Sequence, residues 1–259
     1  MSVSPRKSRR LPKMWLSILS IVGFFAAWQA IASAQVVPAL FLPTLPSVLE
    51  ALRAGAADGT LFVDIGVSLF RAFAGLLVAL VIGVLAGFAM ARVRIVRWFC
   101  DPVISVLFPA PKIAFLPVVI LWFGIDHTSK IMIVAVSCVF PIAIAAYEAA
   151  RSINPFLVWS ALSLGASRAK VQWAIVLPAC GPSLFAALRV AVPVALIMAF
   201  TSEMVAGGGG MGATLMYSQR FFESPTVFAY ILAMLVVGVL MDRGLLAIQR
   251  FTPSLSDQV

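Results

Sequence analysis

Charged side chains are scarce in this sequence. Asp, Glu, Lys and Arg make up 11% of its 259 residues and 62% are hydrophobic, whereas a soluble domain carries about 25% charged residues. No charged residue occurs in 14–49, 72–91, 131–147 or 224–241. A helix of about 20 apolar residues spans the hydrocarbon core of a bilayer, and these runs lack the alternation of a membrane β-strand. The sequence therefore excludes a soluble fold and predicts an all-α, polytopic membrane helical bundle.

Motifs for catalysis and cofactor binding are also missing. The chain has no G-x-x-x-x-G-K-[ST] sequence, so we do not expect it to bind ATP itself. Gly207, Gly209 and Gly212 fit G-x-G-x-x-G, but no predicted strand precedes them, which argues against a dinucleotide site. The single histidine, His127, has no companion ligands nearby, and the three cysteines lack metal or redox spacing. With no paired nucleophile and base, the sequence predicts no enzyme activity, no metal and no cofactor.

The apolar runs predict six membrane-spanning helices. A basic N-terminus, 1–13, precedes the apolar run 14–33, which is longer than the roughly 7–15 apolar residues of a signal peptide and is interpreted as an uncleaved first span. A segment on the far side of the membrane, 34–64, leads to a core of five further spans, 65–246, and 247–259 form a tail. The five spans of the core are placed at about 65–91, 99–123, 129–148, 181–204 and 226–241.

Basic residues give this topology its orientation, because cytoplasmic segments carry an excess of Lys and Arg. On the side of the two termini lie Arg6, Lys7, Arg9, Arg10, Lys13, Arg92, Arg94, Arg97, Arg151, Arg168, Lys170, Arg243 and Arg250. The opposite side holds Arg53, Lys130 and Arg220. We therefore expect both termini to be cytoplasmic. The net charge of +9 follows from this distribution and, without a soluble basic domain, does not indicate nucleic-acid binding.

Small residues recur every four positions in the second predicted span, at Gly75, Ala79, Gly83 and Gly87. This spacing puts them on one helix face, where another backbone can approach closely. That backbone belongs either to another helix of the same chain or to a second copy of the subunit. Packing within the chain is the favoured interpretation.

Four charged residues lie within or near the predicted spans, where charges are rare and usually functional. Lys112 follows two prolines in the third span, and the broken backbone there is tolerated only where it lines a cavity or is buried by protein. Lys112 either lines a pathway or extends to the membrane interface. Glu203 either pairs with Arg71 or Arg189 or faces the pathway. We predict that all four contribute to a translocation pathway or gate.

The cytoplasmic loop 149–178 contains a pattern that the spans do not explain. Residues 156–164 predict a short, mainly apolar helix that ends at Gly165, and a second helical stretch begins at 166–170. An apolar helix on the aqueous side of the membrane is expected to dock on a partner protein.

Five stretches of sequence, in order, carry a family resemblance. They are Phe108-Pro109-Ala110-Pro111-Lys112-Ile113-Ala114-Phe115-Leu116-Pro117, Leu121-Trp122-Phe123-Gly124-Ile125, Gly165-Ala166-Ser167, Ile175-Val176-Leu177-Pro178 and Ser202-Glu203-Met204-Val205-Ala206. Over about 15–255 the chain resembles the inner-membrane permeases of type I ABC importers, specifically the group serving nitrate, sulfonate, taurine and related compounds. The cytoplasmic loop motif of that family has a Glu at the position of Trp159, which is a departure from the pattern.

The resemblance implies a multi-pass protein of the bacterial inner (plasma) membrane, surrounded by lipid, that works with partners. We expect two copies of the permease to form a homodimer that encloses the pathway. The substrate would be a small anion or an organosulfur or nitrogen compound such as nitrate, a sulfonate or taurine. A periplasmic or extracellular substrate-binding protein would deliver the substrate, and a cytoplasmic ABC ATPase subunit would hydrolyse ATP. The residues that would couple to the ATPase are Trp159, Ser160, Ala161, Leu162, Gly165, Ala166 and Ser167. A stand-alone ion-coupled secondary transporter is the alternative, although neither paired repeats nor many deep charges favour it.

Overall fold

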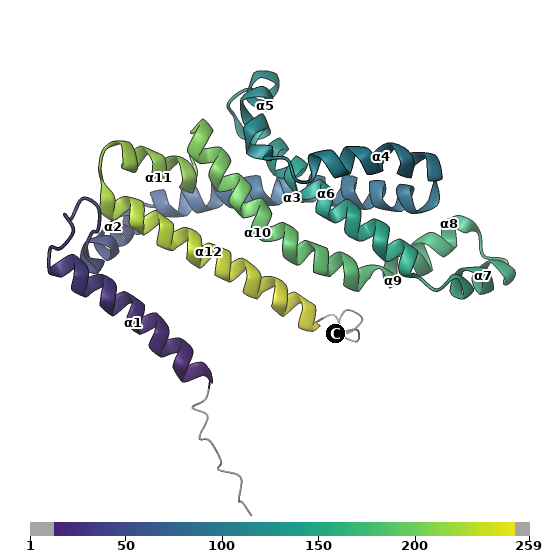
Figure 1. The fold of residues 1–259 in the computed structure, drawn as a ribbon, viewed down its shortest axis with the longest axis horizontal. Helices are drawn as coiled ribbons and strands as arrows, with labels where there is room; N and C mark the ends of the chain where they lie inside the picture. Colours follow the sequence, from purple (N-terminus) through teal and green to yellow (C-terminus); the bar gives the residue numbers. More distant parts are fainter. Residues whose placement is uncertain (1–12, 252–259) are drawn as a thin grey trace, which may run out of the picture.

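A computed structural model describes residues 13–251, so 1–12 of the predicted N-terminus and 252–259 of the predicted tail lie outside the described residues (Figure 1). Every regular element in the described part is helical, which confirms the all-α class. The α-helices are α1 (Lys13–Ser33), α2 (Leu45–Ala57), α3 (Thr60–Arg92), α4 (Arg94–Leu107), α5 (Leu116–Phe123), α6 (His127–Ser152), α7 (Pro155–Ser163), α8 (Arg168–Val171), α9 (Leu177–Ala179), α10 (Gly181–Ala206), α11 (Met211–Arg220) and α12 (Ser224–Phe251). A 3-10 turn, Lys112–Phe115, and a π-helical turn, Gln172–Val176, complete them.

Four helices, α3, α6, α10 and α12, are long and apolar enough to cross a membrane. A fifth span results if α4 and the segment 112–123 are counted as one, although the two parts are bent by 96°. In the described residues α1 contributes an apolar helix over Ile18–Ser33, which is shorter than a full span. By length and composition the described chain thus has four or five spans, against the six predicted.

The third predicted span, 99–123, is two helices instead of one. α4 ends at Leu107, and Pro111 has an extended backbone with φ −73° and ψ 91° before the 3-10 turn begins. Pro109 and Pro111 supply no backbone N–H, and a proline disfavours the helical conformation of the residue before it. The chain therefore leaves the helix here and turns away from α4.

The second predicted span begins five residues earlier than expected, at Thr60 instead of 65. Its start is fixed by Asp58, whose Oδ1 accepts hydrogen bonds from the Thr60 hydroxyl at 2.7 Å and the Thr60 N–H at 2.9 Å. These bonds stabilise the carboxylate and lower the pKa of Asp58 below its ordinary value.

The core lies between α3 and α6, against which α10 packs (Figure 1). The small residues of α3 allow the close approach. A Cβ on Gly75 would lie 2.6 Å from Val134, and one on Gly87 would lie 2.5 Å from the carbonyl oxygen of Ala143, both in α6. Gly83 faces Ile142 of the same helix, and Ala79 is fully buried. This face of α3 is thus occupied by α6 within the same chain.

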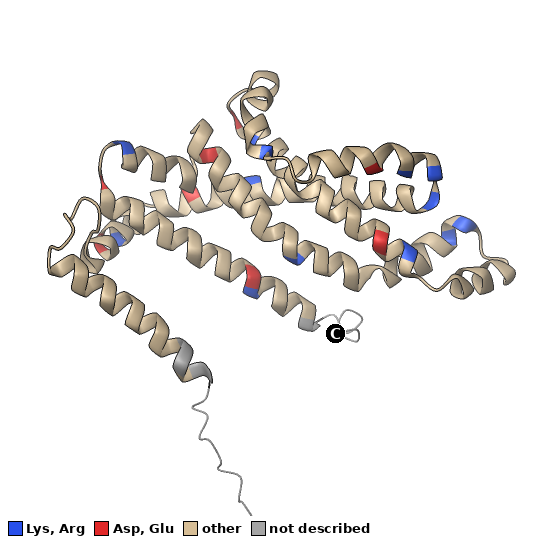
Figure 2. Cartoon of the chain, in the orientation of Figure 1, with Lys and Arg blue, Asp and Glu red and all other residues tan. Residues whose placement is uncertain are grey.

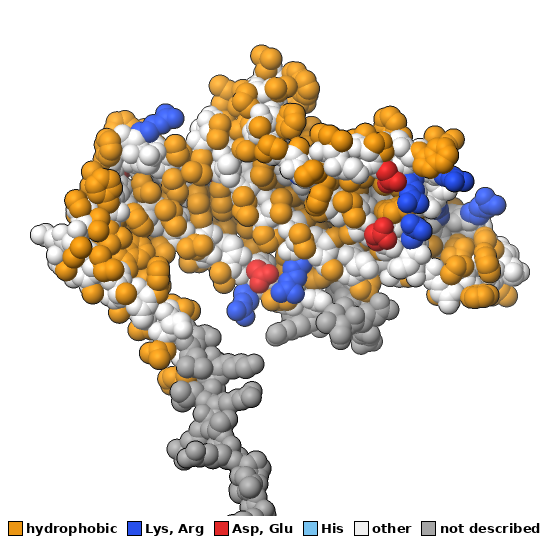
Figure 3. Space-filling view, viewed as in Figure 1, with side chains coloured by type: hydrophobic (Ala, Val, Ile, Leu, Met, Phe, Trp, Pro, Cys, Tyr) orange, Lys and Arg blue, Asp and Glu red, His pale blue; other side chains and the backbone are white. Residues whose placement is uncertain are grey.

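The bundle has two distinct ends. α7 and α8 lie at one end and α2 and α11 at the other, while α1 diverges from the remaining helices (Figure 1). Lys and Arg gather at the end that carries α7 and α8 (Figure 2). Hydrophobic side chains cover most of the visible face between the ends, as a surface in contact with lipid requires (Figure 3).

Candidate functional site

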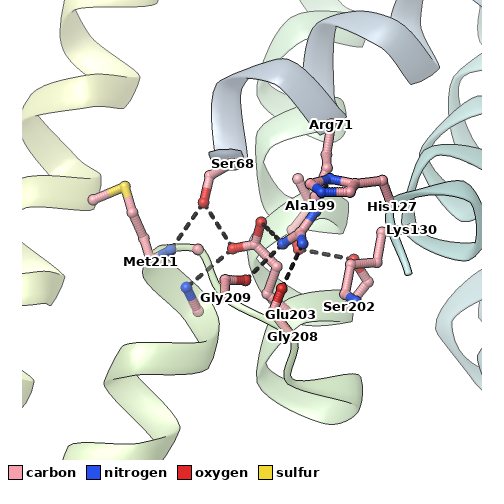
Figure 4. A network of polar contacts seen from close by, with 12 residues as sticks. Ser68, Arg71, His127, Lys130, Ala199, Ser202, Glu203, Gly208, Gly209 and Met211 are labelled. Carbon is pink, nitrogen blue, oxygen red and sulfur yellow. Dashed lines mark hydrogen bonds and ion pairs between the residues drawn. The ribbon is translucent and has the colours of Figure 1, made fainter. Parts of the chain in front are cut away.

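A buried ion pair joins α3 to α10 at the end of the bundle opposite α7. Arg71 Nη1 lies 2.8 Å from Glu203 Oε1, and the two side chains are 1% and 0% exposed (Figure 4). The same guanidinium donates to the carbonyl oxygens of Gly209 at 2.6 Å and Gly208 at 2.7 Å. Its Nε donates to His127 Nδ1 at 3.2 Å, which requires the neutral imidazole with its proton on Nε2. Arg71 therefore makes contact with α10, α6 and the turn after α10.

The carboxylate of Glu203 has further donors. Its Oε2 accepts from Ser68 Oγ at 2.7 Å and from the Gly212 N–H at 3.1 Å. Ser68 Oγ in turn accepts from the Met211 N–H at 2.9 Å. A charge removed from water is tolerated when it is paired and its other lone pairs are hydrogen-bonded, and Glu203 meets both conditions.

Glycine is required in the turn that supplies these groups. Gly207, Gly208, Gly209 and Gly210 all have positive φ, between 66° and 96°. A Cβ on Gly210 would lie 2.5 Å from Glu203 Oε1, and residues with a Cβ seldom adopt these backbone angles. The glycine run, which the sequence offers as a false dinucleotide motif, is the loop that brings backbone groups onto a buried ion pair.

A second carboxylate holds the turn from its other side. Asp64 of α3 accepts from the Gly210 N–H at 3.2 Å, the Thr214 hydroxyl at 2.6 Å and the Tyr230 hydroxyl at 2.8 Å. Thr214 lies in α11 and Tyr230 in α12. We call Asp64, Ser68, Arg71, His127, Glu203 and the turn 207–212 the Arg71–Glu203 network.

Lys130 of α6 lies beside this network and is fully buried. Its Nζ donates to the carbonyl oxygen of Ile125 at 2.5 Å, with the carbonyl of Asp126 at 3.5 Å, and it would lie 3.1 Å from a Cβ on Gly208. In the described part of the chain, no buried side-chain nitrogen or oxygen lacks a hydrogen-bond partner. The network is therefore fully satisfied, and its arrangement holds helix ends together.

The contacts of the network all join parts of the same chain, so the network positions helix ends. A cavity of about 340 Å³ adjoins it and is lined by Glu203, the glycine turn and α11. Among the described residues, no group of three or more His, Cys, Asp or Glu side chains is placed to hold a metal ion.

Lys112 and Arg189, the other two residues predicted at a pathway or gate, lie away from the network. Lys112 is partly exposed at the bend between α4 and α5, where its Nζ donates to the carbonyl oxygen of Phe108 and lies 6.0 Å from the ring centroid of Phe140. Arg189 Nε lies 3.8 Å from Asp242 Oδ1 of α12, and both side chains are about half exposed. Of the two arginines available to Glu203, the structure selects Arg71.

The predicted coupling residues lie at the opposite end of the bundle. Asn154 caps α7, its side chain accepting from the Phe156 N–H at 3.0 Å, and Gly165 ends the segment with φ +83°. Ser167 begins α8 by accepting from the Lys170 N–H. Trp159 stacks edge-on against Phe156, with ring centroids 5.4 Å apart, and α7 has no buried residue. Ser160, Ala161, Leu162 and Ala166 lie on or just after the same helix, with Ala161 and Ala166 packed on the core beneath it.

Sequence reasoning missed several members of the network. The predicted topology puts Asp64 outside the second span and gives His127 no role, and it counts Lys130, which lies beside the network, among the charges outside the membrane. The available signal was their position at predicted span ends, all on the same side of the membrane as the glycine turn. α11 was not predicted because it is short and only weakly apolar.

Buried polar contacts between long apolar helices, in a bundle without strands over the described residues, define a polytopic α-helical membrane protein. The family model "Binding-protein-dependent transport system inner membrane component" matches residues 79–252. The chain belongs to this family and is the permease subunit of an ABC importer, a transport component and not an enzyme, of the bacterial inner membrane.

Two curated relatives support the assignment. The chain is 33% identical to the taurine transport system permease protein TauC of Escherichia coli (strain K12), over 94% of this chain and 93% of the relative. It is 30% identical to the putative aliphatic sulfonates transport permease protein SsuC of Bacillus subtilis (strain 168), over 87% and 82%.

Solved structures support the fold. A chain of an amino acid ABC transporter crystallised with histidines matches with a TM-score of 0.60 at 14% identity, over 76% of this chain and 94% of that one. A chain of the inward-facing MetNI methionine ABC transporter matches with a TM-score of 0.55 at 18% identity, over 70% and 94%.

Proposed function

We propose that this permease imports a small organosulfonate, such as taurine, and that α7 couples it to a cytoplasmic ATPase. The substrate class is supported by the taurine and aliphatic sulfonate permeases among its relatives. The coupling role is supported by one observation above all: large apolar side chains of α7 are not covered by the rest of the chain. Phe156 is 68% exposed, Trp159 59% and Leu164, just after the helix, 88%.

The exposed face of α7 fits a protein partner better than water or lipid. Large apolar side chains on a short helix are a common docking mode, in which the helix lies in a groove of the partner. The surrounding end of the bundle is rich in Lys and Arg, which in membrane proteins marks the cytoplasmic side (Figure 2). The proposed coupling segment is therefore 155–167, with Trp159 making an apolar contact where the family pattern has an acid.

The same orientation places both termini in the cytoplasm and requires six spans, with α1 and the bent segment 94–123 each crossing once. The glycine turn and α11 then face the periplasm, where a substrate-binding protein would dock.

We propose a second copy of the chain as the partner that completes the pathway. Lys112, partly exposed at the bend, is the predicted pathway residue best placed to meet an anion, whereas Arg71 and Glu203 neutralise each other at the periplasmic end.

The coupling proposal is tested by removing the exposed aromatic pair. The double variant Phe156→Ala/Trp159→Ala should lower the amount of ATPase subunit that copurifies with the tagged permease. Loss of aromatic anchors at the centre of an interface costs about 2 kcal/mol or more, or about 30-fold in affinity.

The chain offers a matched control at the opposite end. Tyr217 of α11 and Phe221, just after it, form a similar pair, with ring centroids 4.6 Å apart and side chains 61% and 60% exposed. Tyr217→Ala/Phe221→Ala should leave ATPase recovery unchanged. Equal recovery with both double variants would contradict the coupling role of α7. The substrate is tested separately, by identifying the ligand retained by the partner binding protein.

A further inference from the structure

Beneath α8, two cavities open between the end of α3 and the π-helical turn. The larger, about 570 Å³, is lined by Arg92 and Arg168 together with apolar residues of α3, α6 and α7. The smaller, about 370 Å³, is almost wholly apolar and runs along Val84, Leu85 and Ala89 of α3 to Trp173. Phe88, Arg92 and Gln172 line both, so the two cavities adjoin.

The polar groups of the larger cavity have no partner within the protein. Among the described residues, the side chains of Arg92, Arg168 and Gln172 make no hydrogen bond or ion pair. No Asp or Glu is found among the residues that line either cavity. Three other arginines of this end do have partners: Arg97 pairs with Asp101 at 3.2 Å, Arg94 lies over the Trp98 ring, and Arg151 donates to the Tyr147 hydroxyl at 2.9 Å. Two exposed arginines and one half-buried glutamine thus line a hollow that has no acidic residue in its wall.

The adjoining apolar cavity determines what kind of anion fits. A soluble anion would use the arginines alone and leave Val84, Leu85 and Ala89 facing an empty groove. Trp173 is 68% exposed at the rim, and tryptophan is typical of the membrane–water interface. Basic pockets between membrane helices on the cytoplasmic side bind anionic lipid headgroups.

We propose that an anionic phospholipid binds here, with its phosphate between Arg92 and Arg168 and one acyl chain along the groove of α3. The π-helical turn, a rare element that recurs at functional sites, supplies Gln172 to the headgroup and Trp173 to the chain. The lipid would contact α8 and Val158 and Leu162 of α7. It would therefore set the position of the proposed coupling segment. In this consequence, and in the choice of the cytoplasmic side, the inference rests on the proposed function.

The test compares two double variants that remove the same charge from the same end. Arg92→Gln/Arg168→Gln removes the cavity arginines, and Arg94→Gln/Lys170→Gln removes two basic residues that do not line either cavity. Each full-length protein is purified in neutral detergent, and binding of phosphatidylglycerol, phosphatidylcholine and inorganic phosphate is followed by thermal shift and by native mass spectrometry. We expect each arginine that contacts the lipid phosphate to contribute about fivefold to its affinity, and a basic residue outside the cavity to contribute little in neutral detergent.

The expected result is that phosphatidylglycerol, but neither phosphatidylcholine nor inorganic phosphate, stabilises the wild type and the control variant. The cavity variant should bind it roughly 30-fold more weakly. Ala89→Trp, which fills the apolar groove and keeps both arginines, should also lose binding. Equal affinity in the two double variants would overturn the proposal, and so would a response to inorganic phosphate alone. Because no ATPase is present, failure of the coupling proposal would leave these outcomes unchanged.

Discussion

At the scale of residues, Arg71 and Glu203 illustrate why a charge can lie deep in an apolar bundle. Each group has several partners, so neither charge is uncompensated. Arg71→Ala leaves Glu203 buried without its counter-ion, and we expect it to destabilise the protein by about 3–5 kcal/mol. The measurement is the free energy of unfolding in detergent, from denaturant titration.

Two comparisons sharpen this prediction. Arg189→Ala removes an arginine whose ion pair is long and half exposed, so its cost should be about 0–1 kcal/mol. The double variant Arg71→Met/Glu203→Met should cost far less than the sum of the single replacements, because it removes both charges together. Additive costs would show that the two side chains do not act as a pair.

The close contact between Gly87 and α6 gives a second prediction at the scale of residues. A Cβ there would meet Ala143, Ala146 and Tyr147 of α6 at 2.5–2.8 Å, against backbone atoms and a Cβ that cannot rotate away. Gly87→Ala should therefore destabilise by about 1–3 kcal/mol. Gly66→Ala, in the same helix with no atom within 4 Å of the added Cβ, should be neutral or stabilising by about 0.4–1 kcal/mol. The measurement is the thermal unfolding midpoint of each variant, and equal midpoints for Gly87→Ala and Gly66→Ala would contradict the packing argument.

The sequence predicted the small residues of α3 and the charged residues within the spans, but it did not predict which residues contact one another. Spacing of four residues identifies one face of α3, yet it does not say which helix covers that face. Glu203 is separated from Arg71 by 132 positions and lies much nearer to Arg189 in sequence, so proximity along the chain would favour the arginine that the structure does not select. The choice depends on tertiary placement of α3 beside α10, which residue types alone do not encode.

At the scale of elements, the capping of α7 gives a prediction about local stability. Asn154 satisfies the N–H of Phe156 in a helix of nine residues with nothing buried. Asn154→Ala should cost about 1 kcal/mol of helix stability and speed amide hydrogen exchange over residues 157–163 about fivefold. Ser163→Ala, at the other end of α7, is the control and should change exchange little. Unchanged exchange in the Asn154 variant would mean that packing, not the cap, holds this helix.

Helix positions were predictable where apolar runs are long, and less so where polar residues or prolines intervene. α6, α10 and α12 match the predicted spans to within a few residues at most ends. The bend of 96° between α4 and the segment 112–123 was not predictable, since two prolines predict a break but not its angle. The predicted start of α3 was too late because the charge of Asp64 suggested a residue outside the membrane. The partners that accommodate this charge, Thr214 and Tyr230, lie 150 and 166 residues away in sequence.

At the scale of the whole molecule, the proposed topology places the two ends of the bundle on opposite sides of the membrane. Leu164, beside α7, is 88% exposed, and Phe222, after α11, is 72% exposed. With the native cysteines replaced, Phe222→Cys should react with a membrane-impermeant maleimide on intact spheroplasts. Leu164→Cys should react only after the membrane is permeabilised, and labelling of both from the same side would contradict six spans with cytoplasmic termini.

The Arg71–Glu203 network also bears on how this protein can change shape. Separating α3 from α10 at that end would expose two charges and several backbone groups to an apolar surrounding at once. We therefore expect these helix ends and the glycine turn to move as one rigid body during transport. Displacement of the remaining helices is then expected where α-helical hydrogen bonding is interrupted, as at residues 108–111 and 172–176. We expect hinge motion at these two segments, because each already interrupts regular α-helical hydrogen bonding.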